Sequence, residues 1–227
     1  EKNRDGENNN NSYNYGVEGP TTNKEINNLR QKQQRNLLAT LLLSPGIPMI
    51  LMGDEIGRSQ GGNNNTWCQD NPLGWMDWNH QNWDHDLKEF VLKLISLRKQ
   101  LPEFFSPDSI YDCHKDNTKV KKSHFWIQWH GIKVNKPDWG DWSHTLGFSI
   151  NKNNEGPAIW IGFNAYKESM LFDLPTPISP WKKYIDTSIL KTKNVSKKPL
   201  ANQSNVRIES NSLVLMIANE YSKKITI

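Results

Sequence analysis

The sequence predicts an α/β portion followed by an all-β portion that folds as an antiparallel β-sandwich. Two observations predict the first portion: a helical apolar pattern over 25–43 ends at a proline and a glycine, and a short apolar run over 47–52 follows it. The third observation is a change near residue 106, beyond which short strand-like runs alternate with turn signals. We therefore expect two domains, 1–105 and 106–227.

The first element is a helix over Glu25–Leu43, after an Asn- and Gly-rich loop over 1–24. Thr22 followed by Glu25 predicts a capping box at its start. Ser44-Pro45-Gly46 ends it, because proline cannot continue a helix and glycine suits its end. The apolar positions recur at helical spacing and predict the buried face: Ile26, Leu29, Leu37, Leu38, Leu41 and Leu42.

The run Ile47–Met52 predicts a buried strand of the kind found in parallel sheets. Helix, tight turn and buried strand together form one αβ step of a barrel. A long loop then extends to about Trp83, and connections of that length are usually functional. A second helix is predicted from Asp86 to Leu101, with the pair His85-Asp86 read as its N-terminal cap and Pro102 as its stop.

Seven runs beyond residue 106 have the composition of strands and are separated by turn signals. They are Phe125–His130, Thr145–Ile150, Ala158–Ala165, Met170–Leu174, Trp181–Asp186, Val206–Glu209 and Leu213–Ala218.

Composition argues against disorder, nucleic-acid binding and membrane insertion. Ten tryptophans argue against disorder, although 35% hydrophobic residues and a mean hydropathy of -0.77 make the chain polar. The net charge of +4 is spread along the chain without a long basic block, so we expect a solvated surface and no nucleic-acid partner. No apolar stretch approaches the roughly 20 residues that span a bilayer. Cys68 and Cys113 have no paired spacing and predict free thiols in a reducing, cytoplasmic compartment.

The loop after the predicted strand carries the candidate binding residues. Polar groups just past the carboxyl end of a barrel strand are where α/β barrels bind ligands. The amides of Asn63, Asn64 and Asn65 both donate and accept, which suits sugar hydroxyls. Trp67, Trp75 and Trp78 either stack on pyranose faces or fill the space under the loop. Trp139 and Trp142 likewise form either a glucan platform or a packed domain interface, and both alternatives stay open.

These motifs resemble the last barrel strand and following loop of glycoside hydrolase family 13, in its isoamylase-type debranching branch. In the first portion the matching residues are Ser12 to Thr21, Gly46-Ile47-Pro48-Met49, Gly53-Asp54-Glu55, Gln60, Asn63 to Asn65, Cys68-Gln69-Asp70-Asn71 and Trp75-x-Asp77-Trp78. In the second they are Trp129-His130-Gly131-x-Lys133, Pro137-Asp138-Trp139, Ser143-His144-x-Leu146, Phe163-Asn164-Ala165 and Trp181 to Thr187.

The resemblance implies the terminal βα portion of a (β/α)8 TIM barrel followed by the β-sandwich. It implies hydrolysis of α-1,6 branch linkages, and substrates such as glycogen, amylopectin or limit dextrin. The glucan-binding residues it favours here are Asp54, Asn63, Asn64, Asn65, Trp67 and Asp70. No cofactor or metal is expected. If the source is a photosynthetic eukaryote, the expected compartment is a plastid.

The resemblance also implies that the catalytic acids lie outside this chain. Retaining hydrolysis needs two carboxyl groups roughly 5 Å apart. In the family these acids lie on earlier barrel strands, and no position here matches them. Asp54 and Glu55 are sequence neighbours, which point to opposite sides of a strand, so they bind sugar hydroxyls or anchor the loop instead. The chain begins at Glu1 instead of methionine, so we expect a fragment or a processed product, and its partner is the missing N-terminal barrel portion. A non-catalytic carbohydrate-binding or accessory protein is the alternative.

Overall fold

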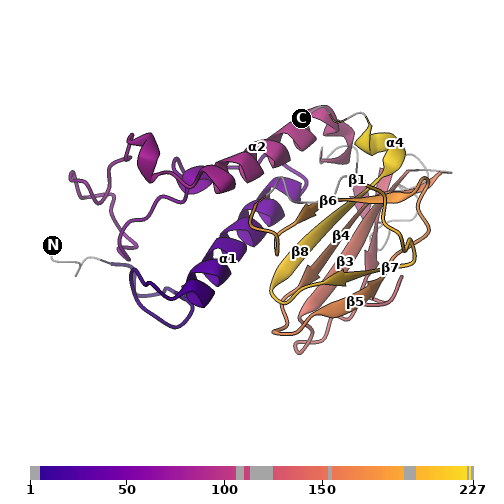
Figure 1. The fold of residues 1–227 in the computed structure, drawn as a ribbon, viewed down its shortest axis with the longest axis horizontal. Helices are drawn as coiled ribbons and strands as arrows, with labels where there is room; N and C mark the ends of the chain where they lie inside the picture. The colour runs from indigo at the N-terminus through magenta and orange to yellow at the C-terminus, as the bar shows by residue number, and fades with distance from the viewer. Residues whose placement is uncertain are drawn as a thin grey trace.

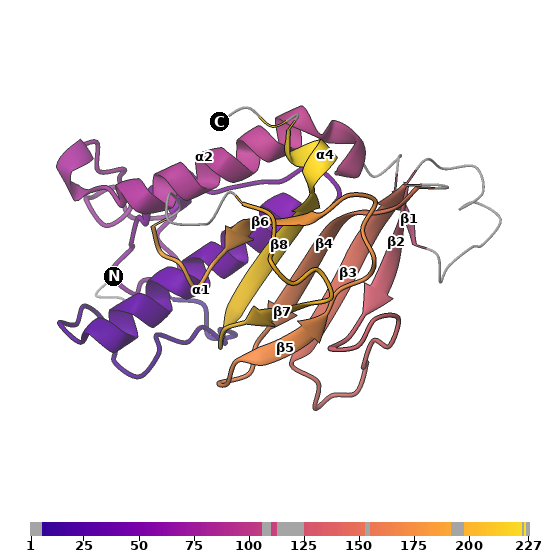
Figure 2. The ribbon, with the colours of Figure 1, turned by 45° about the vertical axis from the view of Figure 1, so that its right-hand side comes forward.

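Helices of the first portion lie side by side along one flank of the larger β-sheet, as both ribbon views show (Figures 1 and 2). The computed structural model describes residues 6–105, 110–112, 125–152, 155–191, 198–223 and 225, with only the backbone for 110–112. The predicted domain boundary at residue 106 lies outside these residues and stays a prediction.

The helices form where the apolar spacing predicts them. Helix α1 spans Lys24–Leu43 and helix α2 spans His85–Gln100. The caps differ from expectation, because the side chain of Asn23 accepts from the first turn of α1 in place of Thr22. At α2 the carboxylate of Asp84 accepts from the amide of Leu87 at 2.8 Å, so the cap precedes His85. Single-turn helices cover Asp54–Ile56 (η1), His80–Asn82 (η2), Pro102–Phe104 (η3) and Asn219–Ser222 (α4).

The β portion contains all seven predicted strands. They are β2 (Phe125–His130), β3 (Thr145–Lys152), β4 (Gly156–Asn164), β5 (Met170–Asp173), β6 (Trp181–Asp186), β7 (Asn205–Ile208) and β8 (Ser212–Ala218). An additional strand, β1 (Ile110–Asp112), pairs with β2 in parallel. The six-stranded sheet has the order β1-β2-β3-β4-β8-β6, and β5 and β7 form a second sheet. Apart from β1, neighbouring strands are antiparallel, as the sandwich prediction requires.

One hydrophobic core joins the helices to the β portion. At one end, Phe104 contacts Phe125 with ring centroids 4.6 Å apart and contacts Tyr221 at 5.1 Å. Between the sheets, Trp160 of β4 meets Phe172 of β5 at 5.9 Å. Residues 6–105 therefore pack on the β-sandwich over shared apolar side chains.

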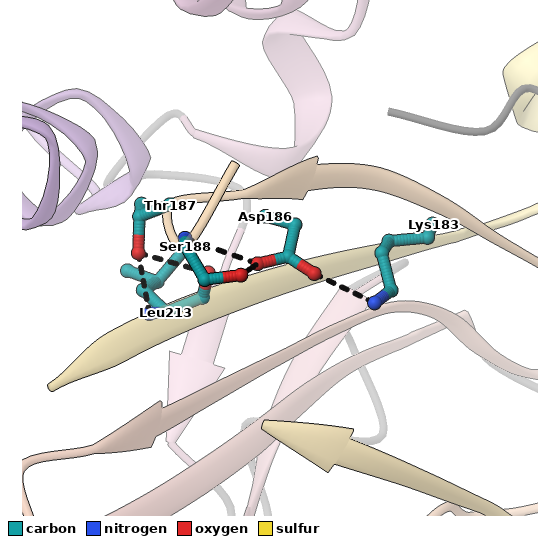
Figure 3. A network of polar contacts seen from close by, with 5 residues as sticks. All are labelled: Lys183, Asp186, Thr187, Ser188 and Leu213. Carbon is teal, nitrogen blue, oxygen red and sulfur yellow. Dashed lines mark hydrogen bonds and ion pairs between the residues drawn. The ribbon is translucent and has the colours of Figure 1, made fainter. Parts of the chain in front are cut away.

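A polar seam fixes α1 against the sandwich. The hydroxyl of Thr187 accepts from the amide of Leu213 at 2.8 Å, and it donates to the side-chain oxygen of Asn36 on α1 at 2.5 Å. Figure 3 shows Thr187 beside Leu213, next to Asp186, whose carboxylate binds Lys183 at 2.7 Å and the Ser188 hydroxyl. The seam places a helix of the first portion at one fixed position on β8.

The predicted buried strand over 47–52 is wrong for this chain. The segment has no regular structure, and the exposed fraction reaches 98% at Ile47 and 87% at Met49. The prediction that Leu37 and Leu41 are buried also fails, with exposed fractions of 70% and 36%. The physical reason is shared: no strand within the described residues pairs with this segment, so nothing covers it or the outer face of α1.

Candidate functional site

The loop between residue 52 and α2 is organised around Gly53 and Arg58. Gly53 has a φ of 101°, and a Cβ there would lie 2.6 Å from Cδ of Arg58, so a side chain at this position is strained and in collision. The amide of Arg58 donates to the Gly53 carbonyl at 2.9 Å. Its guanidinium donates through Nη2 to the carbonyl of Gly74 at 2.6 Å. Arg58 thus ties the beginning of the loop to its middle.

The two acids after Gly53 have different tasks. The Glu55 carboxylate accepts from the Gly53 amide at 2.9 Å, so Glu55 anchors the turn. Asp54 is exposed, yet the protein surrounding its carboxylate raises the pKa, and the neighbouring charge of Glu55 raises it further. Of the two roles expected for this pair, anchoring belongs to Glu55, and the expected contact of Asp54 with sugar stays a prediction.

The structure divides the three predicted asparagines. Asn63 is buried and its side-chain oxygen accepts from the amide of Asn65, so it holds the turn. Asn64 accepts from the amide of Glu7 and donates to the carbonyl of Glu7, both at 2.8 Å. This two-way pair joins the amino-terminal loop to the loop 53–84. The side-chain amides of Asn63 and Asn64, which we expected to bind sugar hydroxyls, therefore form hydrogen bonds within the protein that hold the loop.

Three predicted tryptophans are exposed and do not fill the space under the loop. The exposed fractions are 85% for Trp67, 55% for Trp75 and 66% for Trp78. The predicted residue Asp70 accepts from the indole N–H of Trp75 at 2.8 Å, so the carboxylate orients that ring. The packing alternative is thus excluded for these side chains, and their faces are accessible to a ligand.

A cleft of about 300 Å³ lies beside this tryptophan and brings together residues from both ends of the loop. The residues that supply its chemistry are Arg58, Ser59, Trp75, Asp77 and Trp83. Asp77 accepts from the amide of Asn79 and from the side chain of Asn82, both at 2.8 Å. The bond from Asn82, followed by that from Asn79, lowers the pKa of Asp77, so its carboxylate is ionised at neutral pH.

Sequence reasoning missed Arg58, Trp83 and the role of Asp77 in this cleft. Asp77 stands in the quoted motif Trp75-x-Asp77-Trp78, which was a signal, but the motif does not say what the carboxylate faces. Arg58 had no signal of its own, because its position depends on Gly53 and on a carbonyl 16 residues away.

The amino-terminal loop is held by one arginine. Arg30 of α1 donates to the carbonyls of Asn14, Val17 and Gly19, with Nη1 at 2.9 Å from the last. A guanidinium offers five donors in a fixed plane, which suits several carbonyls of one loop. Arg30 therefore sets the path of the motif Ser12 to Thr21.

On the sandwich, Trp139 and Trp142 are also exposed, with fractions of 63% and 72%. Trp139 contacts Trp129 with ring centroids 5.6 Å apart, and the Trp142 indole donates to Asp138 at 3.2 Å. This chain alone does not bury them as a domain interface.

Neither a metal centre nor a membrane span is found in the parts of the chain that the structure describes. No group of three or more His, Cys, Asp or Glu side chains there could hold a metal ion. No helix there is long and apolar enough to cross a bilayer. Cys68 is an exposed thiol, and Cys113 lies outside the described residues.

Residues 128–220 match the family model described as "Isoamylase 1-3, C-terminal". The chain is 35% identical over 188 residues to the chloroplastic isoamylase 1 of Oryza sativa subsp. japonica, covering 82% of this chain. This chain belongs to the isoamylase family. A glycogen operon protein GlgX homolog of Mycobacterium tuberculosis is 44% identical over 145 residues, which is 62% of this chain.

The isoamylase-family chain is short beside these relatives. It spans 22% of the rice protein and 19% of the mycobacterial one. Its fold is like that of a pullulanase from Bacillus acidopullulyticus, with a TM-score of 0.60, 20% identity, and coverage of 87% of this chain and 21% of that one. A pullulanase from Anoxybacillus sp. LM18-11, solved with maltotetraose, gives a TM-score of 0.57 at 20% identity over 84% of this chain and 24% of that one.

Proposed function

We propose that this chain is the carboxyl-terminal part of a debranching glycoside hydrolase that acts on α-1,6 branch linkages of glycogen or starch. In this proposal it supplies glucan-contacting loops and the β-sandwich, while the catalytic carboxylates lie on the upstream part of the enzyme. The compartment is the cytoplasm, or a plastid as for the relatives named chloroplastic.

The observation that carries the proposal is the uncovered segment 47–52. Besides Ile47 and Met49, Leu51 and Met52 have exposed fractions of 59% and 58%. Contiguous exposed apolar side chains mark a surface that another element covers. We propose that the upstream barrel portion occupies this surface in the complete enzyme.

The acids of the described loop support an incomplete catalytic apparatus. A retaining glycosidase needs a nucleophile and a protonated acid on either side of one anomeric carbon. Glu55 is committed to the Gly53 amide, Asp70 to the Trp75 indole, and Asp77 to two asparagine donors. In the cleft beside Trp75, the carboxylate among the lining residues is that of Asp77. We therefore expect no hydrolysis by the chain alone.

The experiment is complementation with the upstream barrel portion, expressed separately. The assay measures release of reducing ends from glycogen by the chain, by the upstream portion, and by their mixture. Turnover in the mixture only supports the proposal. Release by the chain alone contradicts it, and so does a mixture that is inactive although the two parts form a complex.

Glucan contact by the exposed loop is tested in the reconstituted enzyme. Trp67→Ala removes a side chain that is 85% exposed and is expected to reduce kcat/KM on amylopectin by about 5- to 150-fold, taking about 1–3 kcal/mol for a lost stacking face. Leu171→Ala, at an exposed apolar side chain of β5, is the control. Unchanged kinetics for Trp67→Ala would contradict the proposed contact.

A further inference from the structure

We propose that three aromatic side chains of the β-sandwich, Trp139, Trp142 and Tyr166, form a shelf that binds the side of an α-glucan chain. Their exposed fractions are 63%, 72% and 37%. The inference rests on the proposed function for the class of ligand. It goes beyond that function by placing a second glucan contact on the sandwich, outside the loop 53–84.

The aromatic shelf is assembled from two loops of the sandwich. Trp139 and Trp142 lie between β2 and β3, and Tyr166 lies between β4 and β5. The hydroxyl of Tyr166 donates to the carbonyl of Trp142 at 3.3 Å. The imidazole of His144 donates to the same carbonyl from Nδ1 at 2.6 Å, and its ring centroid is 5.0 Å from that of Tyr166. These contacts join the two loops into one surface.

Both indoles of the shelf are held in place by their own loop. The carboxylate of Asp138 accepts from the amide of Gly140 at 3.0 Å and from the indole N–H of Trp142 at 3.2 Å. A Cβ at Gly140 would collide with the Trp142 ring, so one side of this ring lies against the backbone. Trp139 contacts Trp129 of β2 edge to face, with ring centroids 5.6 Å apart. A ligand that stacks on fixed rings has little side-chain ordering to impose, so the shelf is preorganised.

The exposed rings have a polar rim that suits sugar hydroxyls. Single exposed apolar side chains are normal on a protein surface, whereas a group of them with a polar rim marks an interaction site. An ionised carboxylate has about four acceptor positions, and Asp138 uses one on each oxygen for Gly140 and Trp142. The neighbouring Asp141 is also exposed. A pyranose has an apolar C–H face and a hydroxyl rim, so it can stack on an indole while its hydroxyls donate to these carboxylates.

The charges and the exposure of the shelf favour a neutral polymer. Residues 137–144 contain two aspartates and no lysine or arginine, which disfavours a nucleic acid or a phosphate group at the indoles. The indoles are exposed on a turn, closed by the Ser143 amide bound to the Gly140 carbonyl at 2.9 Å. Rings exposed in this way contact the side of a long chain and do not enclose its end. An α-glucan meets both conditions.

The shelf lies away from the exposed segment 47–52. That segment follows Gly46, whose amide binds the Phe105 carbonyl, and the adjacent Phe104 packs on Phe125, the first residue of β2. The shelf indoles follow the last residue of β2, in the loop that extends from the lower end of the large sheet, whereas α2 lies along its upper side (Figure 2). A barrel portion that covers 47–52 can therefore leave the shelf accessible to glucan.

The test measures how strongly amylopectin in a native gel retards the 227-residue chain. The double variant Trp139→Ala/Trp142→Ala is expected to raise the apparent dissociation constant by about tenfold or more, because two stacking faces are lost. Trp139→Tyr and Trp142→Phe keep an aromatic face and should stay within about threefold of the parent. Leu171→Ala, at a side chain of β5 that is 45% exposed, is the control for loss of an exposed apolar group. Circular dichroism of each variant confirms that the fold is retained.

Several outcomes overturn the shelf. Equal retardation of the parent and the double variant shows that amylopectin binds elsewhere, as does a loss in Trp67→Ala alone. A parent chain that amylopectin does not retard also excludes the site. Complementation measures turnover independently of these gels, so restored turnover with an unretarded chain refutes only the shelf. Retardation that depends on Trp139 and Trp142, with no turnover from a mixture that forms a complex, refutes the debranching proposal and leaves the shelf in place.

Discussion

The buried imidazole of His130 should make the stability of this chain fall in mildly acidic solution. His130 lies on β2 with an exposed fraction of 1%. Its Nδ1 accepts from the backbone amide of Asn135 at 2.9 Å, and its Nε2 lies 2.9 Å from the hydroxyl of Ser149. The bond at Nδ1 requires a lone pair there, so the ring is the neutral tautomer that donates from Nε2 to Ser149.

Burial lowers the pKa of His130 from 6.5 to about 4. The unfolded chain therefore binds a proton at this residue between pH 6.5 and 4, whereas the folded chain does not. Stability from this group is complete above pH 6.5, decreases as the pH falls, and levels off below about pH 4. A difference of about 2.5 pKa units corresponds to about 3 kcal/mol at 1.36 kcal/mol per unit, as an upper value.

The assay is urea unfolding at intervals between pH 4 and 7.5 for the parent, His130→Gln and His144→Gln. Glutamine can keep both hydrogen bonds without titrating, so the pH dependence of His130→Gln should be flatter by about 2–3 kcal/mol over this interval. His144→Gln, at an exposed histidine of the same sandwich, is the matched control for the loss of an imidazole. Parallel curves for the parent and His130→Gln would refute the argument, because other groups would then account for the acid sensitivity.

Four other predictions follow from particular contacts. Thr187→Val removes the hydroxyl that links Leu213 to Asn36, and should lower the free energy of unfolding by about 1–3 kcal/mol in the same urea assay. Tyr184→Phe should be neutral or stabilising, because the Tyr184 hydroxyl is buried without a hydrogen-bond partner among the described residues, and burial raises its pKa to about 12; a loss above about 1 kcal/mol would reveal a partner. Gly53→Ala should cost about 1–3 kcal/mol, because it forces a side chain into a positive φ against Arg58, and thermal unfolding measures the cost. Limited proteolysis should cut 1–105 before 106–227, within the exposed segment 47–52 or the loop 53–84, and equal resistance of both halves, measured by mass spectrometry, would contradict this.

The β portion could be predicted from sequence because its strands are short, apolar and separated by turn residues. For β2, the predicted and observed bounds are identical at Phe125–His130. The short parallel strand β1 was not predicted, since its pairing with β2 depends on a contact across the fold. Caps were displaced by one or two residues for a related reason: Thr22, Asn23, Asp84 and Asp86 all have suitable side chains, and local geometry selects among them.

The site was harder to predict, because an amide or a guanidinium can bind many partners. Three consecutive asparagines suggested sugar contacts, yet Asn64 pairs with Glu7, which is 57 residues away. Arg58 was overlooked because its carbonyl partner and the glycine beneath its stem become neighbours only after folding. Residue types thus identified the loop. Which of its side chains hold the loop, and which remain exposed, became clear only from the three-dimensional structure.

The segment 47–52 shows what a disagreement between sequence and structure can mean. Its composition favours a strand buried on both faces, and its observed side chains are largely exposed. A strand is stabilised by hydrogen bonds to its neighbours, so the local preference alone cannot fold it when no neighbour is present. Leu37 and Leu41 of the adjacent helix repeat the pattern, with apolar residues facing outward. A single partner surface that covers both elements explains both exposed faces, and these faces therefore support the proposal that an upstream barrel portion packs there.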